Sequence, residues 1–160
     1  MMNSTNREEK ITLYGQAAEL LEAALAWFPR EMWQYRSPVD SWTIHEIVIH
    51  ITDSEANSYV RCRRFIAEPG EQLMAYDENQ WAKVLDYHQL DVDTAVSLFK
   101  WLRQSSYELI QTVADDVWQH EAYHSESGRM TFDDWLDTYT NHVPDHIAQM
   151  ERIYAAWQAR

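Results

Sequence analysis

The chain has 160 residues, of which 46% are hydrophobic; this is enough apolar material for one packed core but short for two, so we expect a single domain over residues 1–160. The 26 acidic residues outnumber the 13 Lys and Arg and give a formal charge of −13. This charge would repel phosphate backbones and anionic membranes, so we expect neither nucleic acid nor a membrane as a partner. The single cysteine cannot form an internal disulfide and the polar start MMNSTNREEK lacks the apolar core of a secretory signal, so we expect a cytoplasmic protein.

Residues 6–28 form the first predicted helix. Their apolar side chains recur at spacings of three and four, which is typical of a helix with one buried stripe. The stripe consists of Tyr14, Ala17, Ala18, Leu21, Ala24, Leu25 and Phe28. Pro29 follows directly, and an aromatic loop with Trp33 and Tyr35 leads to the next helix start.

A second helix is predicted from residue 44 to about residue 67, where Pro69 and Gly70 interrupt helical geometry. Its start has the spacing of a capping box, in which the Thr43 hydroxyl accepts from the backbone N–H of Glu46 and the Glu46 carboxylate reaches back. One line of polar residues shares a side of this helix because its members are three or four apart. The line consists of Thr43, Glu46, His50, Asp53 and Asn57.

The connection over residues 71–90 is too long for an ordinary loop, and we expect a short helix near residues 78–85 within it. Long crossings of this kind are typical of bundles whose consecutive helices are not all antiparallel neighbours. The predicted architecture is therefore all-α, a four-helix bundle with a long crossover connection.

The third bundle helix is expected to begin at Asp91 or Asp93, either of which can cap it. Its apolar positions continue at helical spacing to residue 113, so the helix should end near residues 115–116. Residues 117–130 show no helical period, and we expect an irregular crossing there.

The last helix is predicted over residues 131–158, with Thr131 and Asp134 available to cap it. Two sets of residues recur in it every seven positions, which is where a bundle helix places its apolar side chains. The sets are Phe132, Tyr139, His146 and Ile153, and Trp135, His142, Gln149 and Ala156. Two histidines thus occupy positions that normally point into the bundle.

His142 and His146 are four residues apart, and side chains at that spacing on a helix can close on one metal ion. His50, in the polar line of the second helix, is the candidate for a third ligand. Three imidazoles leave one face of a divalent ion open, as in catalytic sites, and zinc, nickel and iron all suit such ligands. The alternative is a set of core histidines satisfied by neighbouring acceptors. His120 and His124 are also four apart, but in the segment expected to be irregular, so we do not expect them to bind metal.

Three segments resemble the DinB/YfiT-like family: WTIHEIVIHITDSEANSYVR in the second helix, GRMT before the last helix, and the His-x-x-x-His-Ile-x-Gln pattern within it. The resemblance spans nearly the whole chain and implies a four-helix bundle with a divalent metal on three histidines, at positions that match His50, His142 and His146. It also implies that some relatives are transferases or isomerases that use a low-molecular-weight thiol cofactor. The chain departs from the family pattern at Asp145, where many members have a further histidine, and this departure leaves the three ligand positions intact.

The leading hypothesis is an enzyme of the thiol-transferase or hydrolase kind, whose metal activates a thiol or water against a small-molecule electrophile. Glu46 and Asp53, about one turn either side of His50, are candidates to orient an imidazole or accept a proton, and Gln149 to orient water. Arg61 and Arg64, in the only basic cluster, are candidates to hold carboxylates of an anionic thiol cofactor, or else form a solvated face.

The rival hypothesis is a non-catalytic, stress-related metal-binding bundle, in which the ion joins two helices and the aromatic loops bind a partner or small ligand. We also expect a homodimer, because 21 aromatic residues are more than a bundle of this size easily buries. Tyr154 and Trp157, near the end of the last helix, are the candidates for that contact.

Overall fold

The computed structural model describes residues 4–160, so the first three residues of the polar start lie outside the description. The α-helices are α1 (Ser4–Trp27), α2 (Ile44–Ala67), α3 (Glu78–Val84), α4 (Val92–Ile110) and α5 (Phe132–Gln158). Short 3-10 helices cover Arg30–Met32, Tyr87–Gln89 and Asp115–Gln119, and the strands are β1 (Gln72–Leu73), β2 (Glu121–His124) and β3 (Gly128–Thr131).

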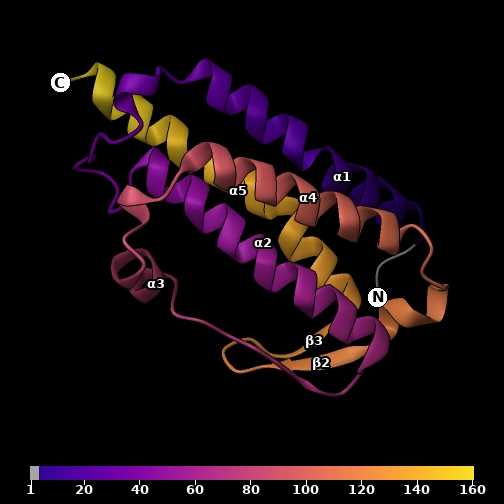
Figure 1. The fold of residues 1–160 in the computed structure, drawn as a ribbon. Coiled ribbons are helices and arrows are strands. Elements are labelled where there is room, and N and C mark those ends of the chain that lie inside the picture. The colour runs from indigo at the N-terminus through magenta and orange to yellow at the C-terminus, as the bar shows by residue number, and fades with distance from the viewer. Residues whose placement is uncertain (1–3) are drawn as a thin grey trace.

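The four long helices form a bundle in which α1 and α2 each pack against both α4 and α5 (Figure 1). Helices α2 and α4 are neighbours that run in the same direction, opposite to α1 and α5. The chain must therefore return along the bundle between α2 and α4, and it does so through the segment that contains β1 and α3. The predicted four-helix bundle with a long crossover is confirmed.

The helix starts follow from local capping. The Thr43 hydroxyl accepts from the Glu46 backbone N–H at 3.2 Å, and the Glu46 carboxylate accepts from the Thr43 N–H at 2.8 Å, which is the predicted capping box. Thr131 and Asp134 form a second capping box at the start of α5. Asp91 accepts from a backbone N–H in the first turn of α4. These bonds satisfy amide groups that a helix leaves unpaired at its N-terminus.

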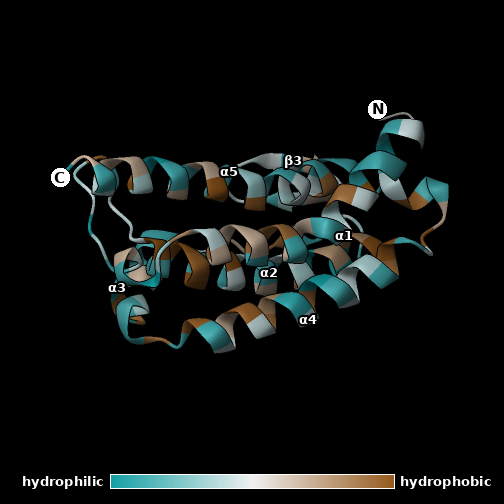
Figure 2. Cartoon of the chain, turned by 90° about the horizontal axis from the view of Figure 1, so that it is seen from above, coloured by the Kyte–Doolittle hydropathy of each residue, from teal (hydrophilic) through white to brown (hydrophobic). Residues whose placement is uncertain are grey.

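The core divides into two groups of buried apolar side chains. In Figure 2, hydrophobic and hydrophilic residues alternate along the long helices, so that each helix has an apolar side to bury. One group joins α1, α2 and α4 with the end of α5, and the other lies around the start of α5, where Phe132 stacks between Phe65 and Trp118. The site described below lies on the segments of α2 and α5 that carry Ile49, Ile51 and Val143 of the first group.

A buried ion pair links the helices at the middle of the bundle. Arg103 of α4 donates to the Glu55 carboxylate of α2 at 2.6 Å, and both side chains are only 1% exposed. Tyr14 of α1 donates to the other Glu55 oxygen, and the backbone carbonyl of Tyr139 accepts from Arg103. All four bundle helices thus share one polar network.

The segment after α4 differs from the prediction. Helix α4 ends at Ile110, a few residues early, and the crossing expected to be irregular contains a 3-10 helix and the antiparallel hairpin of β2 and β3. Strand β1 pairs in parallel with β2 and completes a three-stranded sheet. Strands of two and four residues are too short to show a period of two in the sequence. The turn of the hairpin uses Gly128 at φ +74°, which glycine adopts at little cost.

Tyr154 and Trp157, which motivated the expected dimer, are partly buried against the core of their own chain and stack on each other. The aromatic residues that face solvent are instead Trp27, Trp101 and Tyr123, which are 61%, 74% and 51% exposed. The homodimer remains a prediction. Within residues 4–160, every helix is too short or too polar to cross a membrane.

Candidate metal centre

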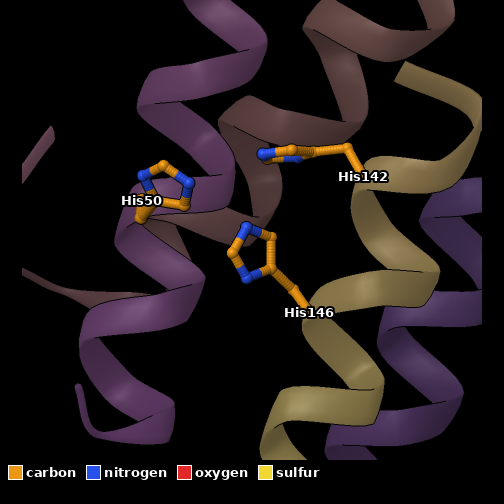
Figure 3. A group of neighbouring side chains, drawn as sticks. All are labelled: His50, His142 and His146. Atoms are coloured by element: carbon orange, nitrogen blue, oxygen red, sulfur yellow. The ribbon is translucent and has the colours of Figure 1, made fainter. Parts of the chain in front are cut away.

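Three histidines from two helices converge on one point. His50 projects from α2, and His142 and His146 project from successive turns of α5, which packs beside α2. One ring nitrogen of each histidine lies within 4.8 Å of the others, and the three rings point toward a common centre (Figure 3). The inward positions that the heptad spacing indicated for His142 and His146, and the polar line of α2 that holds His50, therefore meet.

The surroundings keep these imidazoles neutral. Burial, followed by the repulsion that a second proton would meet beside His146, lowers the pKa of His50 to about 3. Burial likewise lowers the pKa of His142, and it lowers that of His146 although a hydrogen bond partly opposes it. A neutral imidazole offers a nitrogen lone pair, so the donor set fits a divalent ion that prefers nitrogen ligands, such as zinc.

The proton position on His146 is fixed by a chain of two residues. Gln149 donates from its amide nitrogen to both oxygens of Asp40, at 3.0 and 2.9 Å, so its amide oxygen must face His146. That oxygen lies 2.8 Å from His146 Nδ1, which therefore carries the proton and leaves Nε2 free for an ion. We expected Gln149 to orient a bound water; its side chain instead orients His146. Asp40 was not predicted, since it lies in the loop before α2.

His50 is held in a different way. Its side chain is 3% exposed, its Nδ1 is buried without a hydrogen-bond partner in the described residues, and its ring packs edge-on against Trp42 with centroids 4.8 Å apart. Its Nε2 lies 3.6 Å from a carboxylate oxygen of Glu78, the first residue of α3. Glu78 was missed by the sequence reasoning, although its segment was predicted to be a short helix in the crossover.

The two candidate acids of α2 are bonded to other residues and do not line the cavity beside the histidines. The Glu46 carboxylate is taken up by the helix cap and by Arg36, which donates at 2.7 Å. Burial raises the pKa of Glu46, but the bonds from Thr43 and Arg36 outweigh it, so the pKa is lowered. Asp53 accepts a 2.5 Å hydrogen bond from the Tyr87 hydroxyl, and burial raises its pKa. Both carboxylates thus have structural partners.

A cavity of about 430 Å³ opens beside the histidines, and His50 and His142 form part of its wall. The crossover between α2 and α4, the hairpin and the first half of α5 supply most of the remaining wall. The other lining residues are Ser54, Arg61, Tyr76, Asp77, Glu78, Asn79, His124, Glu126, Thr138 and Tyr139. The wall is rich in hydrogen-bonding groups and has room for a small polar molecule.

The two candidate arginines occupy different places. Arg61 lines the cavity, where it donates twice to the Met74 carbonyl and once to the Tyr139 hydroxyl. A guanidinium has five N–H groups, so two of them have no acceptor in these bonds. Arg64 pairs with Glu68 at 3.1 Å and is not part of the cavity wall. The structure therefore brings Arg61 to the site and leaves Arg64 outside it.

His124 lies closer to the site than we expected, because the hairpin folds back over the cavity. Its Nδ1 accepts from the backbone N–H groups of Glu126 and Ser127, both at 3.3 Å, so the ring carries its proton on Nε2. Burial and the nearby guanidinium lower its pKa. The ring of His120 instead bonds the Phe65 carbonyl at 2.8 Å, outside the cavity wall. His120 precedes β2 and His124 ends it, and the two rings have different partners, so the pair is not a shared ligand set.

A family model described as the DinB superfamily matches residues 13–150. A curated protein of Oceanobacillus iheyensis, named "Putative metal-dependent hydrolase OB0782", is 28% identical over 119 residues, which are 74% of this chain and 67% of that protein. "Putative metal-dependent hydrolase YfiT" of Bacillus subtilis is 27% identical over 113 residues, which are 70% of this chain and 64% of that protein. The matched part spans about two thirds of the length of these curated relatives.

Solved structures give the same fold. The structure of YfiT from Bacillus subtilis superposes with a TM-score of 0.87 at 22% identity, covering 96% of this chain and 88% of that one. A mycothiol-dependent maleylpyruvate isomerase superposes with a TM-score of 0.73 at 14% identity, covering 89% of this chain and 60% of that one. At these identities the likeness concerns the fold alone.

Proposed function

The chain belongs to the DinB superfamily, and from this premise we propose that it is a metal-dependent enzyme acting on a small molecule. His50, His142 and His146 hold a divalent ion, which supplies a Lewis acid able to lower the pKa of a water or thiol. The observation that carries the proposal is the convergence of three neutral imidazoles, two of which, His50 and His142, form part of the wall of a polar cavity. Closed structural sites commonly use four protein ligands, whereas a set of three histidines leaves a position for a reactant.

The protein's own groups divide the work around that position. Gln149 and Asp40 hold the His146 ring with its Nε2 toward the ion site. The Trp42 ring restricts His50, and the bundle core behind both helices excludes water from that side. Preorganised ligands of this kind do not need to be ordered when the ion binds, which favours affinity.

The cavity also offers donors for an anionic group on the substrate or on a thiol cofactor. Arg61 has two N–H groups left over from its bonds to Met74 and Tyr139, and His124 carries its proton on Nε2. A guanidinium recognises carboxylates in a two-point manner, so Arg61 is the principal candidate. Both the relatives named as hydrolases and the thiol-dependent structural neighbour are consistent with this arrangement.

Buried Cys62 is not a competing nucleophile. Its thiol is fully buried, and burial raises its pKa to about 12, so almost no thiolate exists near neutral pH. The protein therefore supplies no thiolate of its own, and a thiol activated at the ion site would enter from solvent. This leaves the three histidines as the centre of the chemistry.

The test is metal analysis of untagged protein, followed by assays of the metal-loaded protein against ester, amide and thiol-acceptor substrates. We expect one ion per chain in the wild type and none in His50→Ala, His142→Ala or His146→Ala. His120→Ala, which alters a histidine outside the cavity, should retain the ion. If the wild type binds no stoichiometric metal, the proposal fails. An ion that exchanges neither water nor thiol would indicate the non-catalytic metal-binding bundle.

A further inference from the structure

We propose that Glu78 is a fourth, displaceable ligand of the ion, an inference that rests on the proposed function. Its Oε2 lies 3.6 Å from His50 Nε2, the nitrogen that points toward the other two histidines in Figure 3. The distance is too long for a hydrogen bond, so that contact alone does not account for the position of the carboxylate. Glu78 therefore approaches the ligand side of the ring and not its outer edge.

The distance fits two ligands of one ion. Around a tetrahedral ion with bonds of about 2.0 to 2.2 Å, two ligand atoms lie about 3.3 to 3.6 Å apart. The three imidazole nitrogens, within 4.8 Å of one another, need only small shifts to reach that spacing. A carboxylate on a half-exposed side chain can make a similar shift, since the Glu78 side chain is 54% exposed.

The neighbours of Glu78 fix its backbone but leave its carboxylate free. Asp77 caps α3 by accepting from the Gln80 N–H at 2.9 Å, and Asn79 accepts from the Trp42 indole N–H at 3.2 Å. Trp42 in turn packs on His50, so α3 is anchored beside the ion site. The Glu78 carboxylate makes no hydrogen bond within residues 4–160, which distinguishes it from Asp77.

Charge also favours this role. Three neutral imidazoles leave the full +2 charge of an ion beside a low-dielectric core, and a carboxylate ligand halves the charge to be buried. Because α3 belongs to the crossover and not to the bundle, its carboxylate can leave the ion while the histidines stay in place. An anionic reactant can then replace Glu78 without a change in the net charge of the site.

The test compares the metal-loaded wild type with Glu78→Gln and with a matched control, Glu126→Gln, which removes the same charge from the same cavity wall. We expect the Kd for Zn²⁺ to rise about 10- to 100-fold or more in Glu78→Gln and to change less than about threefold in the control. In the Co²⁺-substituted protein, the visible absorption bands should shift in Glu78→Gln alone. Azide, an anion that must displace the carboxylate in the wild type, should bind Co²⁺ more tightly in Glu78→Gln.

A crystal structure of the Zn²⁺-loaded wild type gives a second measurement that does not depend on a variant. A Glu78 oxygen at about 2.0 to 2.2 Å from zinc supports the proposal. An oxygen beyond 3 Å, or an unchanged Zn²⁺ Kd and cobalt spectrum in Glu78→Gln, overturns it. In either case a wild type that binds one ion through the histidines leaves the proposed function intact, whereas a wild type that binds none removes both.

Discussion

Replacing Gln149 by methionine should weaken metal binding through His146. Methionine has a similar length but neither accepts from His146 Nδ1 nor donates to Asp40, so the hydrogen bond to His146 and the two to Asp40, at 2.8 to 3.0 Å, are lost. The His146 ring is then free to rotate and to place its proton on Nε2, the nitrogen that the ion needs. In the wild type, Gln149 prevents both the rotation of the ring and the shift of its proton to Nε2.

The expected increase in the Kd of the ion follows from the lost hydrogen bond to His146 and from the need to order the His146 ring when the ion binds. A neutral hydrogen bond contributes about 0.5 to 1.5 kcal/mol, and ordering one side chain on binding costs about 0.5 to 1.5 kcal/mol. Together they amount to about 1 to 3 kcal/mol, or about 5- to 150-fold in the Kd of the ion. This range agrees with the roughly 10- to 100-fold effect of other residues that orient metal-binding histidines.

The assay is a competition titration of Zn²⁺ against a chromophoric chelator at neutral pH. Gln158→Met makes the same change near the end of α5, where the native amide bonds only the exposed Tyr154 hydroxyl, and it should leave the Kd unchanged. Asp40→Ala should have an intermediate effect, because Gln149 keeps its bond to His146 but loses its anchor. A Kd for Gln149→Met within twofold of wild type would refute the reasoning.

Four further predictions concern stability and assembly. As the pH falls below about 6.5 the metal-free protein should lose stability, because the unfolded chain takes up protons on histidines that the fold keeps neutral. For His50, whose pKa is lowered to about 3, the loss should approach about 1.4 kcal/mol per pH unit near pH 5, and His142 and His146 act in the same direction; urea titrations giving a flat profile would contradict this. Arg103→Met should lower the free energy of unfolding by about 3 to 5 kcal/mol, since Glu55 stays buried without its cation, and a loss below about 1 kcal/mol would argue otherwise. Pro144→Ala gives α5 an N–H for the Thr140 carbonyl and should stabilise the metal-free protein by at most about 3 kcal/mol. A simultaneous fall in Zn²⁺ affinity would link the proline to the site. Unchanged Zn²⁺ affinity would limit the role of the proline to helix geometry. Sedimentation equilibrium at micromolar concentration should give twice the 19.0 kDa chain mass, and a mass near 19.0 kDa would exclude the dimer.

The bundle could be predicted because its signals are local. The capping box of Thr43 and Glu46 and the stop after residue 67 are read from adjacent residues, and the structure has both. Histidines at inward positions of two helices must point into the same interior if the helices are neighbours. For this reason the approach of His50 to the α5 pair followed from spacing, whereas its exact distance did not.

The parts that escaped prediction depend on where connecting segments pack. Asp40, Glu78 and His124 come from a loop, a crossover helix and a hairpin, and nothing in their local spacing indicates that they lie around the site. Asp53 shows the opposite case, since it shares the side of α2 that carries His50 and yet is taken up by Tyr87 from the crossover. Tertiary contacts of this kind override a position on a helix face.

The division between helices and connections has a consequence for specificity. The three histidines belong to bundle helices, but much of the cavity wall comes from the crossover and the hairpin, which bring Glu78 and His124. Surface connections tolerate changes in length and sequence better than packed helices do. Substitutions of Tyr76, or in the turn at 124–127, should therefore alter which small molecule binds while the affinity for the ion stays close to that of the wild type. The same bundle can hold one ion and serve different substrates because the groups that bind the ion and many of those that face the substrate lie on separately variable segments.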